Sequence, residues 1–158
     1  MSPKTYPGGG VWLSDLDVRD LTGHESRSDR PAVELLARLG YQPAGPAAFA
    51  IWCPVGFRCD AASIPRVLWG VYPAWARSNR AAVLHDYAYC VQFCSRERAD
   101  SLFREALRAC GVSSVRSWIM WRAVRMGGGA YWNARKPEDV QAAREHAARN
   151  GGSLEVSP

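Results

Sequence analysis

SNRAAVLHDYAYCVQFCSRERADSLFREALRACG, residues 78–111, is the stretch that decides the fold. Its first half, up to Phe93, is apolar almost all the way round a helix, which is typical of a helix buried in the middle of a domain. Its second half has a capping serine at Ser95, an apolar stripe at helical spacing and a stop at Gly111. We therefore expect two antiparallel helices joined by a tight turn.

Two more helices are expected after this pair. Ser113 or Ser114 can open a third helix, and the three glycines at 127–129 are expected to stop it. Pro137 can open a fourth helix, which the glycines at 151–152 would end.

The residues before the helical pair predict strands. Residues 47–60, AAFAIWCPVGFRCD, resemble a β-hairpin, because two apolar runs flank the turn residues 54–56. Partial alternation in VWLSDLDV, from Val11 onward, is compatible with a short strand. Residues 31–39 predict a helix of about two turns that begins at a proline, with an extended conformation as the open alternative.

These patterns predict one domain over residues 1–158, of the α+β class and mainly helical. An N-terminal β-hairpin region would pack on the two antiparallel helices, with the third helix across them. We expect residues 1–30 to be loose or docked on a partner, and residues 137–150 to form the C-terminal helix. The composition, 47% hydrophobic and 22% charged, is that of a globular rather than a disordered chain.

Charge and hydropathy exclude some classes of function. The net charge is +5, but no block of five basic residues occurs, so specific nucleic-acid binding is not expected. The first ten residues contain no apolar run of the kind that a secretion signal needs, and no stretch approaches the roughly 18 apolar residues of a membrane span. We therefore expect a protein made in the cytoplasm, without a membrane span.

The cysteine count is odd, at five. In a reducing compartment these residues are expected to be free thiols packed as small apolar groups. The alternative is a zinc site, although its C-x5-C and C-x3-C spacings fit zinc modules poorly; its ligands would be Cys53, Cys59, Cys90 and Cys94. A disulfide would become plausible after exposure to an oxidising environment.

The polar residues of the buried helix are the candidate site. His85 and Asp86 are adjacent, so they point about 100° apart and each needs its own partner. Asp100, at the edge of the next helix's apolar stripe, could reach His85 with about one turn of stagger. A histidine held by a carboxylate keeps one tautomer and can act as a general base on water. The alternative is a core histidine satisfied by a carboxylate.

Two further carboxylates complete the candidate site. Asp86 could bind a hard cation such as calcium, together with backbone carbonyls and water, and the cation would polarise an ester or amide. Asp60 opens a rigid loop that ends at Pro65, where it either faces the site or scaffolds its own loop together with Ser63. Ser63 is a weak candidate nucleophile, because no elbow motif surrounds it. Whether the protein is an enzyme stays open at this point.

Three ordered motifs resemble a family of unknown function that is common in tailed phages and prophages. They are G-F-x-x-D-x-A-S-x-P-R at 56–66, H-D-x-x-Y at 85–89 and S-R-x-x-A-D at 95–100, within a core of residues 47–132. The resemblance implies a phage setting, often among tail and lysis genes, and brings no established activity. It adds the motif residues Ser63, Arg66 and Tyr89 to the candidate binding residues.

The H-D-x-x-Y helix followed by an Asp-bearing helix also looks like secreted calcium-dependent phospholipases of the A(2) type. That likeness implies His85 as the base, Asp86 as the metal ligand and Asp100 as the residue that orients the base. The Gly- and Cys-rich calcium loop of those enzymes is missing here, and Asp60 with its loop would have to substitute.

The expected third helix carries Trp118, Trp121, Arg122 and Arg125 on one side. These residue types are typical anchors of protein interfaces. Core packing with snorkelling arginines, a docking face for another virion protein and a membrane-surface face are all compatible with this pattern.

The leading hypothesis is a virion-associated protein of the phage tail or baseplate that retains a hydrolase-like His–Asp centre, with other phage structural proteins as partners. The alternative is an active metal-dependent hydrolase of lipid or cell envelope, and a third hypothesis is a host-directed lysis accessory. The expected location is the host cytoplasm during synthesis and then the virion tail.

Overall fold

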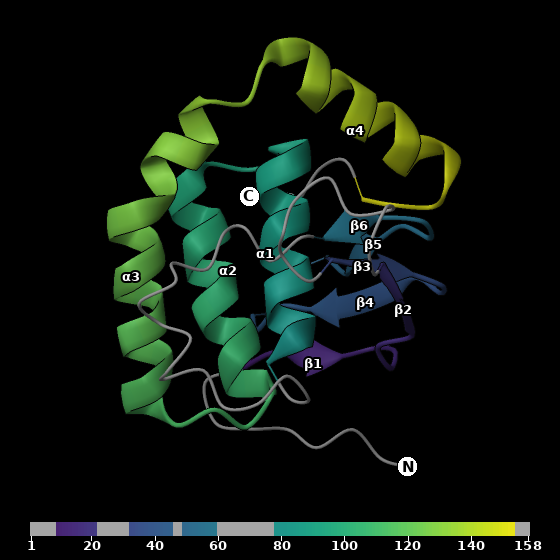
Figure 1. The fold of residues 1–158 in the computed structure, drawn as a ribbon. Helices are drawn as coiled ribbons and strands as arrows, with labels where there is room; N and C mark the ends of the chain where they lie inside the picture. The colour runs from purple at the N-terminus through teal and green to yellow at the C-terminus, as the bar shows by residue number, and fades with distance from the viewer. Residues whose placement is uncertain (1–8, 22–31, 46–48, 60–77, 154–158) are drawn as a thin grey trace.

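The computed structural model of the chain describes residues 9–21, 32–45, 49–59 and 78–153. Helix α1 (Asn79–Val91) lies in the middle, between two small sheets and α2 (Arg96–Ala109) (Figure 1). Helix α3 (Ser114–Asn133) packs on the outer side of α2, and α4 (Pro137–Arg149) contacts α1 near the sheets. The α+β, mainly helical class expected from the sequence is confirmed.

The ends of α2 follow the local signals in the sequence. The Ser95 hydroxyl accepts a hydrogen bond from the backbone N–H of Arg98 at 3.2 Å, which caps the first turn. At the other end Gly111 has a φ of +80°, and the N–H of Val112 donates to the carbonyl of Leu107 at 3.0 Å. This is the Schellman ending that glycine favours, so the predicted start and stop of α2 are confirmed.

The C-terminus of α1 is held by a partner from far along the chain. Gln92 caps it in the left-handed region, with a φ of +48°. Arg144 of α4 donates to the carbonyls of Val91 at 2.9 Å and Gln92 at 3.2 Å. The helix end therefore gains both hydrogen bonds and a cation at its negative pole.

Helix α3 does not stop at the glycines at 127–129, as the sequence predicted, but continues to Asn133. The reason is close packing: a Cβ added to Gly128 would lie 2.5 Å from the Tyr89 hydroxyl oxygen of α1. Tertiary contact has overridden the low helix propensity of glycine, which costs about 1 kcal/mol per residue. The predicted fourth helix is present, and Gly151 follows it with a φ of +75°.

In the described residues, six short strands form two antiparallel three-stranded sheets. The strands are β1 (Val11–Trp12), β2 (Val18–Leu21), β3 (Ala32–Leu35), β4 (Leu39–Gln42), β5 (Ile51–Cys53) and β6 (Arg58–Cys59). One sheet has the order β1-β4-β5 and the other β2-β3-β6. The chain therefore passes from one sheet to the other three times.

Of the hairpin predicted over residues 47–60, the turn is confirmed, but the pairing of its two strands is wrong. The turn is present, with Gly56 at a φ of +75° and the N–H of Phe57 donating to the Pro54 carbonyl at 3.3 Å. The two strands beside it do not pair with each other, because β5 joins β4 and β6 joins β3. Gly56 donates to the Leu35 carbonyl at 2.8 Å, which ties the turn to β3 and moves the chain to the other sheet.

The prediction of a helix over residues 31–39 is wrong. The extended alternative is observed instead in residues 32–35. Residues 32–35 form β3, which pairs with β2 on one side and with β6 on the other. An isolated two-turn helix is marginal in water, whereas a strand with partners on both sides satisfies its backbone groups in the sheet.

Within the described parts of the chain, none of the four helices has the length and apolar character that crossing a membrane requires.

The packing of Gly128 can be tested against its neighbour. Gly128→Ala should destabilise the protein relative to Gly129→Ala by about 2 kcal/mol, because the new methyl group displaces Tyr89. At Gly129 a Cβ meets Arg96 at an ordinary 3.7 Å, so that variant keeps the gain in helix propensity. Urea unfolding followed by circular dichroism gives both values, and equal stability of the two variants would contradict the packing argument.

Candidate functional site

The centre of the polar network is Asp100, which lies on α2 and has no exposed surface. Its Oδ1 lies 2.8 Å from Nε2 of His85 and accepts a hydrogen bond from the Tyr89 hydroxyl at 2.7 Å. Its Oδ2 accepts from Arg125 at 3.0 Å and lies 3.8 Å from the Arg96 guanidinium. One carboxylate therefore has hydrogen-bond partners on α1 and α3 and an ion-pair partner on its own helix α2.

Helical spacing explains why His85 and Tyr89 share this target. They are four residues apart on α1, so they project from the same face. The His85 ring lies 4.3 Å from the Tyr89 ring and 4.7 Å from the Phe103 ring, measured between centroids. Only 2% of His85 is exposed. The structure thus brings His85 and Asp100 together, but in the interior rather than in an open cleft.

Arg125 lies partly inside the molecule. The sequence grouped it with Trp118, Trp121 and Arg122 on one side of α3, but its guanidinium turns inward to Asp100. Arg96, which was not among the predicted site residues, is four residues before Asp100 on α2 and donates to the Arg125 carbonyl at 3.2 Å. Its spacing is the signal that could have identified it, since i and i+4 side chains are neighbours.

The electrostatics of the network favour an ionised carboxylate. Burial raises the pKa of Asp100, but hydrogen bonds from His85, Tyr89 and Arg125 outweigh it, so the pKa lies below its ordinary value. Burial and the neighbouring Asp100 raise the pKa of Tyr89, which stays a neutral donor. Because an ionised carboxylate only accepts, the proton between His85 and Asp100 belongs to Nε2 of the histidine.

In this tautomer the remaining atom of His85 that could act as a base is Nδ1. A base must reach a water or a substrate to take a proton. With the ring 2% exposed and in contact with Tyr89 and Phe103, the described residues leave it no open path. His85 and Asp100 are the residue types of a catalytic His–Asp pair, but they are as buried as a pair that only stabilises the fold.

Asp86 faces a different partner, as its position next to His85 requires. It is 6% exposed, and its Oδ2 accepts a hydrogen bond from the Cys59 thiol of β6 at 2.7 Å. Among the residues that the structure describes, no three His, Cys, Asp or Glu side chains gather as metal ligands. The role of Asp86 as a calcium ligand stays a prediction. Asp60, Ser63 and Arg66 lie outside the described residues.

The cysteines differ in burial: Cys53 and Cys59 are buried, and the other three are partly buried. All five are free thiols, in line with the first expectation from the sequence. Cys59 contacts Asp86, and Cys90 accepts a hydrogen bond from Arg135 at 2.8 Å. Burial raises the pKa of Cys94 to about 11. The alternative zinc site of Cys53, Cys59, Cys90 and Cys94 does not form among these described residues.

The two tryptophans of the candidate surface differ in burial. Trp118 is 48% exposed, and the Arg122 guanidinium lies 5.9 Å from its ring centre. Trp121 is half-buried, with the guanidinium of Arg104 5.5 Å from its ring centre. The side of α3 that the sequence treated as one surface therefore divides into an outward part and a part that packs against α2.

The fold and this network define a small α+β domain with a buried carboxylate that clasps three helices. Residues 33–124 match the family model described as protein of unknown function (DUF1353). The match covers more than half of the 158 residues, and the chain belongs to this family. The matched segment contains His85, Tyr89, Arg96 and Asp100. No curated protein and no solved structure matches the chain.

The network should be tested first through stability. Asp100→Asn removes the charge that holds two guanidinium groups and His85, so we expect a loss of about 3 kcal/mol or more in the free energy of unfolding. Glu97→Gln, an exposed position on the same helix, is the control and should change it by less than about 0.5 kcal/mol. Similar losses in both variants would contradict the conclusion that Asp100 holds the three helices together.

The same carboxylate predicts a pH dependence. Its pKa is lower in the folded protein than the ordinary value of 3.8, so its stabilisation is complete above that pH. The stabilisation is then lost as the pH falls toward the folded-state pKa. Denaturant titrations from neutral pH to below that value should show a steeper acid loss for the natural protein than for Asp100→Asn. Parallel curves would count against an ionised Asp100.

Proposed function

We propose that this protein is a virion-associated component of a phage tail or baseplate, in which the His85–Asp100 pair is an internal clasp rather than a working catalytic centre. The observation that carries the proposal is the burial of the pair: 2% of His85 and none of Asp100 is exposed. Other structural proteins of the particle would be its partners.

The hydrogen-bond pattern of Asp100 supports this reading. A carboxylate that only orients a catalytic histidine needs one strong contact to the ring. Here both oxygens are engaged, and Arg125 brings α3 into the same network. Such a saturated carboxylate stabilises one arrangement of three helices, which suits a component whose shape must persist in an assembly.

The phage setting is supported by the three ordered motifs, which resemble proteins of tailed phages and prophages. The assignment to the tail or baseplate, and to the virion after synthesis in the host cytoplasm, follows from that resemblance.

A metal-dependent hydrolase of lipid or cell envelope is the second candidate, because one observation favours it. The 2.8 Å contact between His85 and Asp100, with Asp86 next to the histidine, matches the order of residues in phospholipases of the A(2) type. The contact of Asp86 with Cys59 weighs against it, since a calcium ligand would have to release that thiol.

Purified particles and purified protein separate the two candidates. Mass spectrometry of virions from the phage or prophage that encodes the chain should detect the protein in a fixed ratio to known tail proteins. Assays on mixed phospholipids and cell-wall fragments, with calcium or with a chelator, should show no turnover. Absence from the particles would overturn the structural proposal.

Turnover would need a matched control before it is credited to the His–Asp pair. His85→Gln should then abolish it, whereas His146→Gln, on α4 and bonded to the Val55 carbonyl, should not. That pattern, with Trp118→Ala also active, would replace the structural proposal by the hydrolase.

A further inference from the structure

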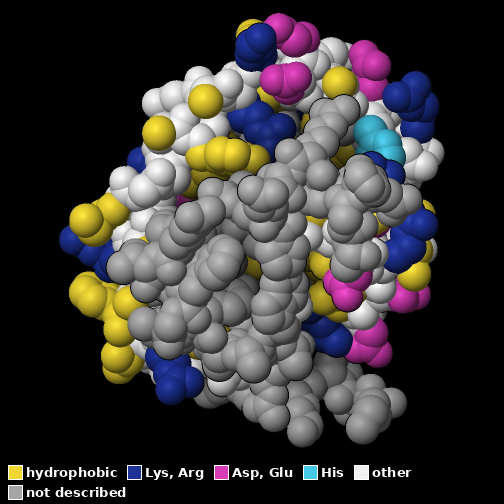
Figure 2. All heavy atoms as spheres, in the orientation of Figure 1, with side chains coloured by type: hydrophobic (Ala, Val, Ile, Leu, Met, Phe, Trp, Pro, Cys, Tyr) yellow, Lys and Arg dark blue, Asp and Glu magenta, His cyan; other side chains and the backbone are white. Residues whose placement is uncertain are grey.

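Large apolar side chains are exposed along the outward side of α3. Val115 is 69% and Met126 80% exposed, and Trp118 and Ile119 are exposed between them. Their spacing places these four residues, the outer face of α3, on the side opposite the buried Met120 and Val124. Hydrophobic side chains are visible along the left edge of Figure 2, where Figure 1 places α3. Contiguous exposed apolar groups mark a surface that meets a partner.

The charges beside this face have one sign. Helix α3 contains no Asp or Glu, whereas Arg116 and Arg122 are exposed on it. Basic side chains lie next to the apolar ones along the same edge of Figure 2. A surface that is apolar and basic complements a partner that is apolar and anionic.

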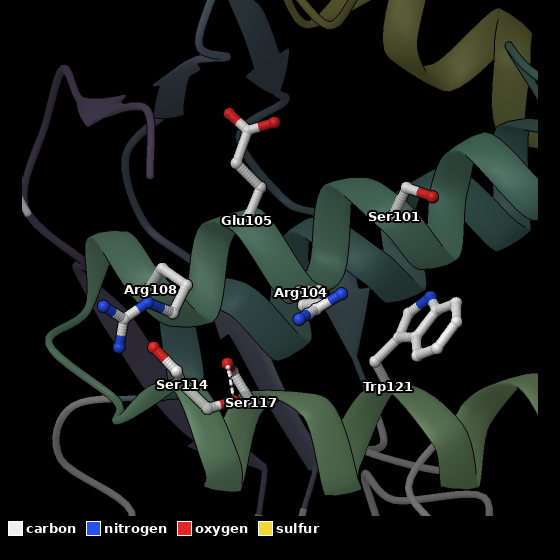
Figure 3. A pocket seen from close by; sticks show the side chains of 7 residues that line it. All are labelled: Ser101, Arg104, Glu105, Arg108, Ser114, Ser117 and Trp121. Atoms are coloured by element: carbon white, nitrogen blue, oxygen red, sulfur yellow. Dashed lines mark hydrogen bonds between the residues drawn. The ribbon is translucent and has the colours of Figure 1, made fainter. Parts of the chain in front are cut away.

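A pocket of about 430 Å³ lies between α2 and α3, and two of its lining residues, Ser114 and Trp121, neighbour Trp118 of this face by helical spacing. Arg104 and Arg108 line it from α2, and Ser114, Ser117 and Trp121 line it from α3 (Figure 3). Guanidinium groups are donors that bind phosphate oxygens. Arg108 also donates to the Val112 carbonyl, and the Ser117 hydroxyl donates to the Ser114 carbonyl. The N-terminus of α3, at Ser114, adds the positive end of a helix dipole to the same pocket.

Of the described residues that line the pocket, Glu105 is the acidic one, and its carboxylate is directed elsewhere. The Glu105 carboxylate accepts hydrogen bonds from the Tyr41 hydroxyl at 2.9 Å and the Ala44 N–H at 2.6 Å. In Figure 3 it points away from Ser114, Ser117 and Trp121. Among the described residues, the charged side chains that face the space between the two helices are therefore arginines.

We propose that this side of the protein binds the surface of an anionic phospholipid bilayer. A lipid phosphate occupies the pocket beside Arg104 and Arg108, while Trp118, Ile119 and their apolar neighbours enter the interfacial layer. Tryptophan and arginine are both favoured at that depth of a membrane. A protein partner would also use exposed Trp and Arg, but it would not need a basic pocket beside them.

This inference goes beyond the proposed function and does not depend on it. A tail component and a hydrolase could each dock on a membrane, and neither role by itself requires the outer face of α3.

Vesicle flotation with the full chain tests the proposal. The probes are vesicles of phosphatidylcholine alone and of phosphatidylcholine with about 30% phosphatidylglycerol. We expect binding to the anionic vesicles to be at least about tenfold tighter, and to weaken at high salt because the arginines are screened. Equal binding to both vesicles, or no binding to either, overturns the proposal.

Matched variants locate the surface. Trp118→Ser should weaken binding to the anionic vesicles by about tenfold, and Arg104→Gln by about fivefold. Leu36→Ser and Arg149→Gln, at an exposed apolar and an exposed basic position outside α2 and α3, should leave it unchanged. Thermal melts check that each variant is folded. Equal losses in the control variants would show that another surface is responsible.

A soluble probe distinguishes a lipid headgroup from free phosphate. Glycerol 3-phosphate should bind far more weakly than the vesicles, because it lacks the apolar part of the contact. If it binds as tightly as the anionic vesicles and Trp118→Ser has no effect, the pocket takes a soluble phosphate ester and the membrane proposal is wrong.

Discussion

A carboxylate without exposed surface needs hydrogen bonds and positive charges from the protein in place of water. For Asp100, side chains of three helices supply them. His85 and Tyr89 fix the face that α1 turns to α2, and Arg125 fixes the rotation of α3. The glycine at 128 follows from the same requirement, since α3 must come close enough for the Tyr89 hydroxyl to fit beneath it. The packing of α1, α2 and α3 therefore depends on the buried carboxylate of Asp100.

The same constraint bears on how the His–Asp pair should be understood. The contact between His85 and Asp100 has the atoms of a general base and its orienting carboxylate, but composition alone does not make a catalytic site. The two aromatic rings that flank the imidazole keep it dry, and the arginines neutralise the carboxylate from the other side. In such surroundings a polar network specifies one packing arrangement, which we take to be its role here.

Sequence reasoning succeeded where signals are local. The caps at Ser95 and Gly111 and the all-round apolar character of α1 predicted both central helices, and the need of a buried His85 for a carboxylate pointed to Asp100. It failed where distant residues decide. The sequence around the glycines at 127–129 contains no signal that Gly128 packs against Tyr89 of another helix. The inward direction of the Arg125 side chain likewise depends on how α3 packs against α2. The described strand over residues 32–35 depends on β6, more than twenty residues further along the chain.

The alternation of the strands between two sheets has a consequence for cooperativity. Neither sheet is built from a continuous segment: β4 and β5 of one lie between β3 and β6 of the other. The turn at Gly56 connects β5 to β6 and is hydrogen-bonded to Leu35 of β3. Separating β6 from β3 would therefore also break the contact of this turn with β3. The two sheets are therefore interlocked through the order of the chain, and local fraying of one cannot proceed far without opening the other. The strand half should melt as a single unit despite its small, separate ladders.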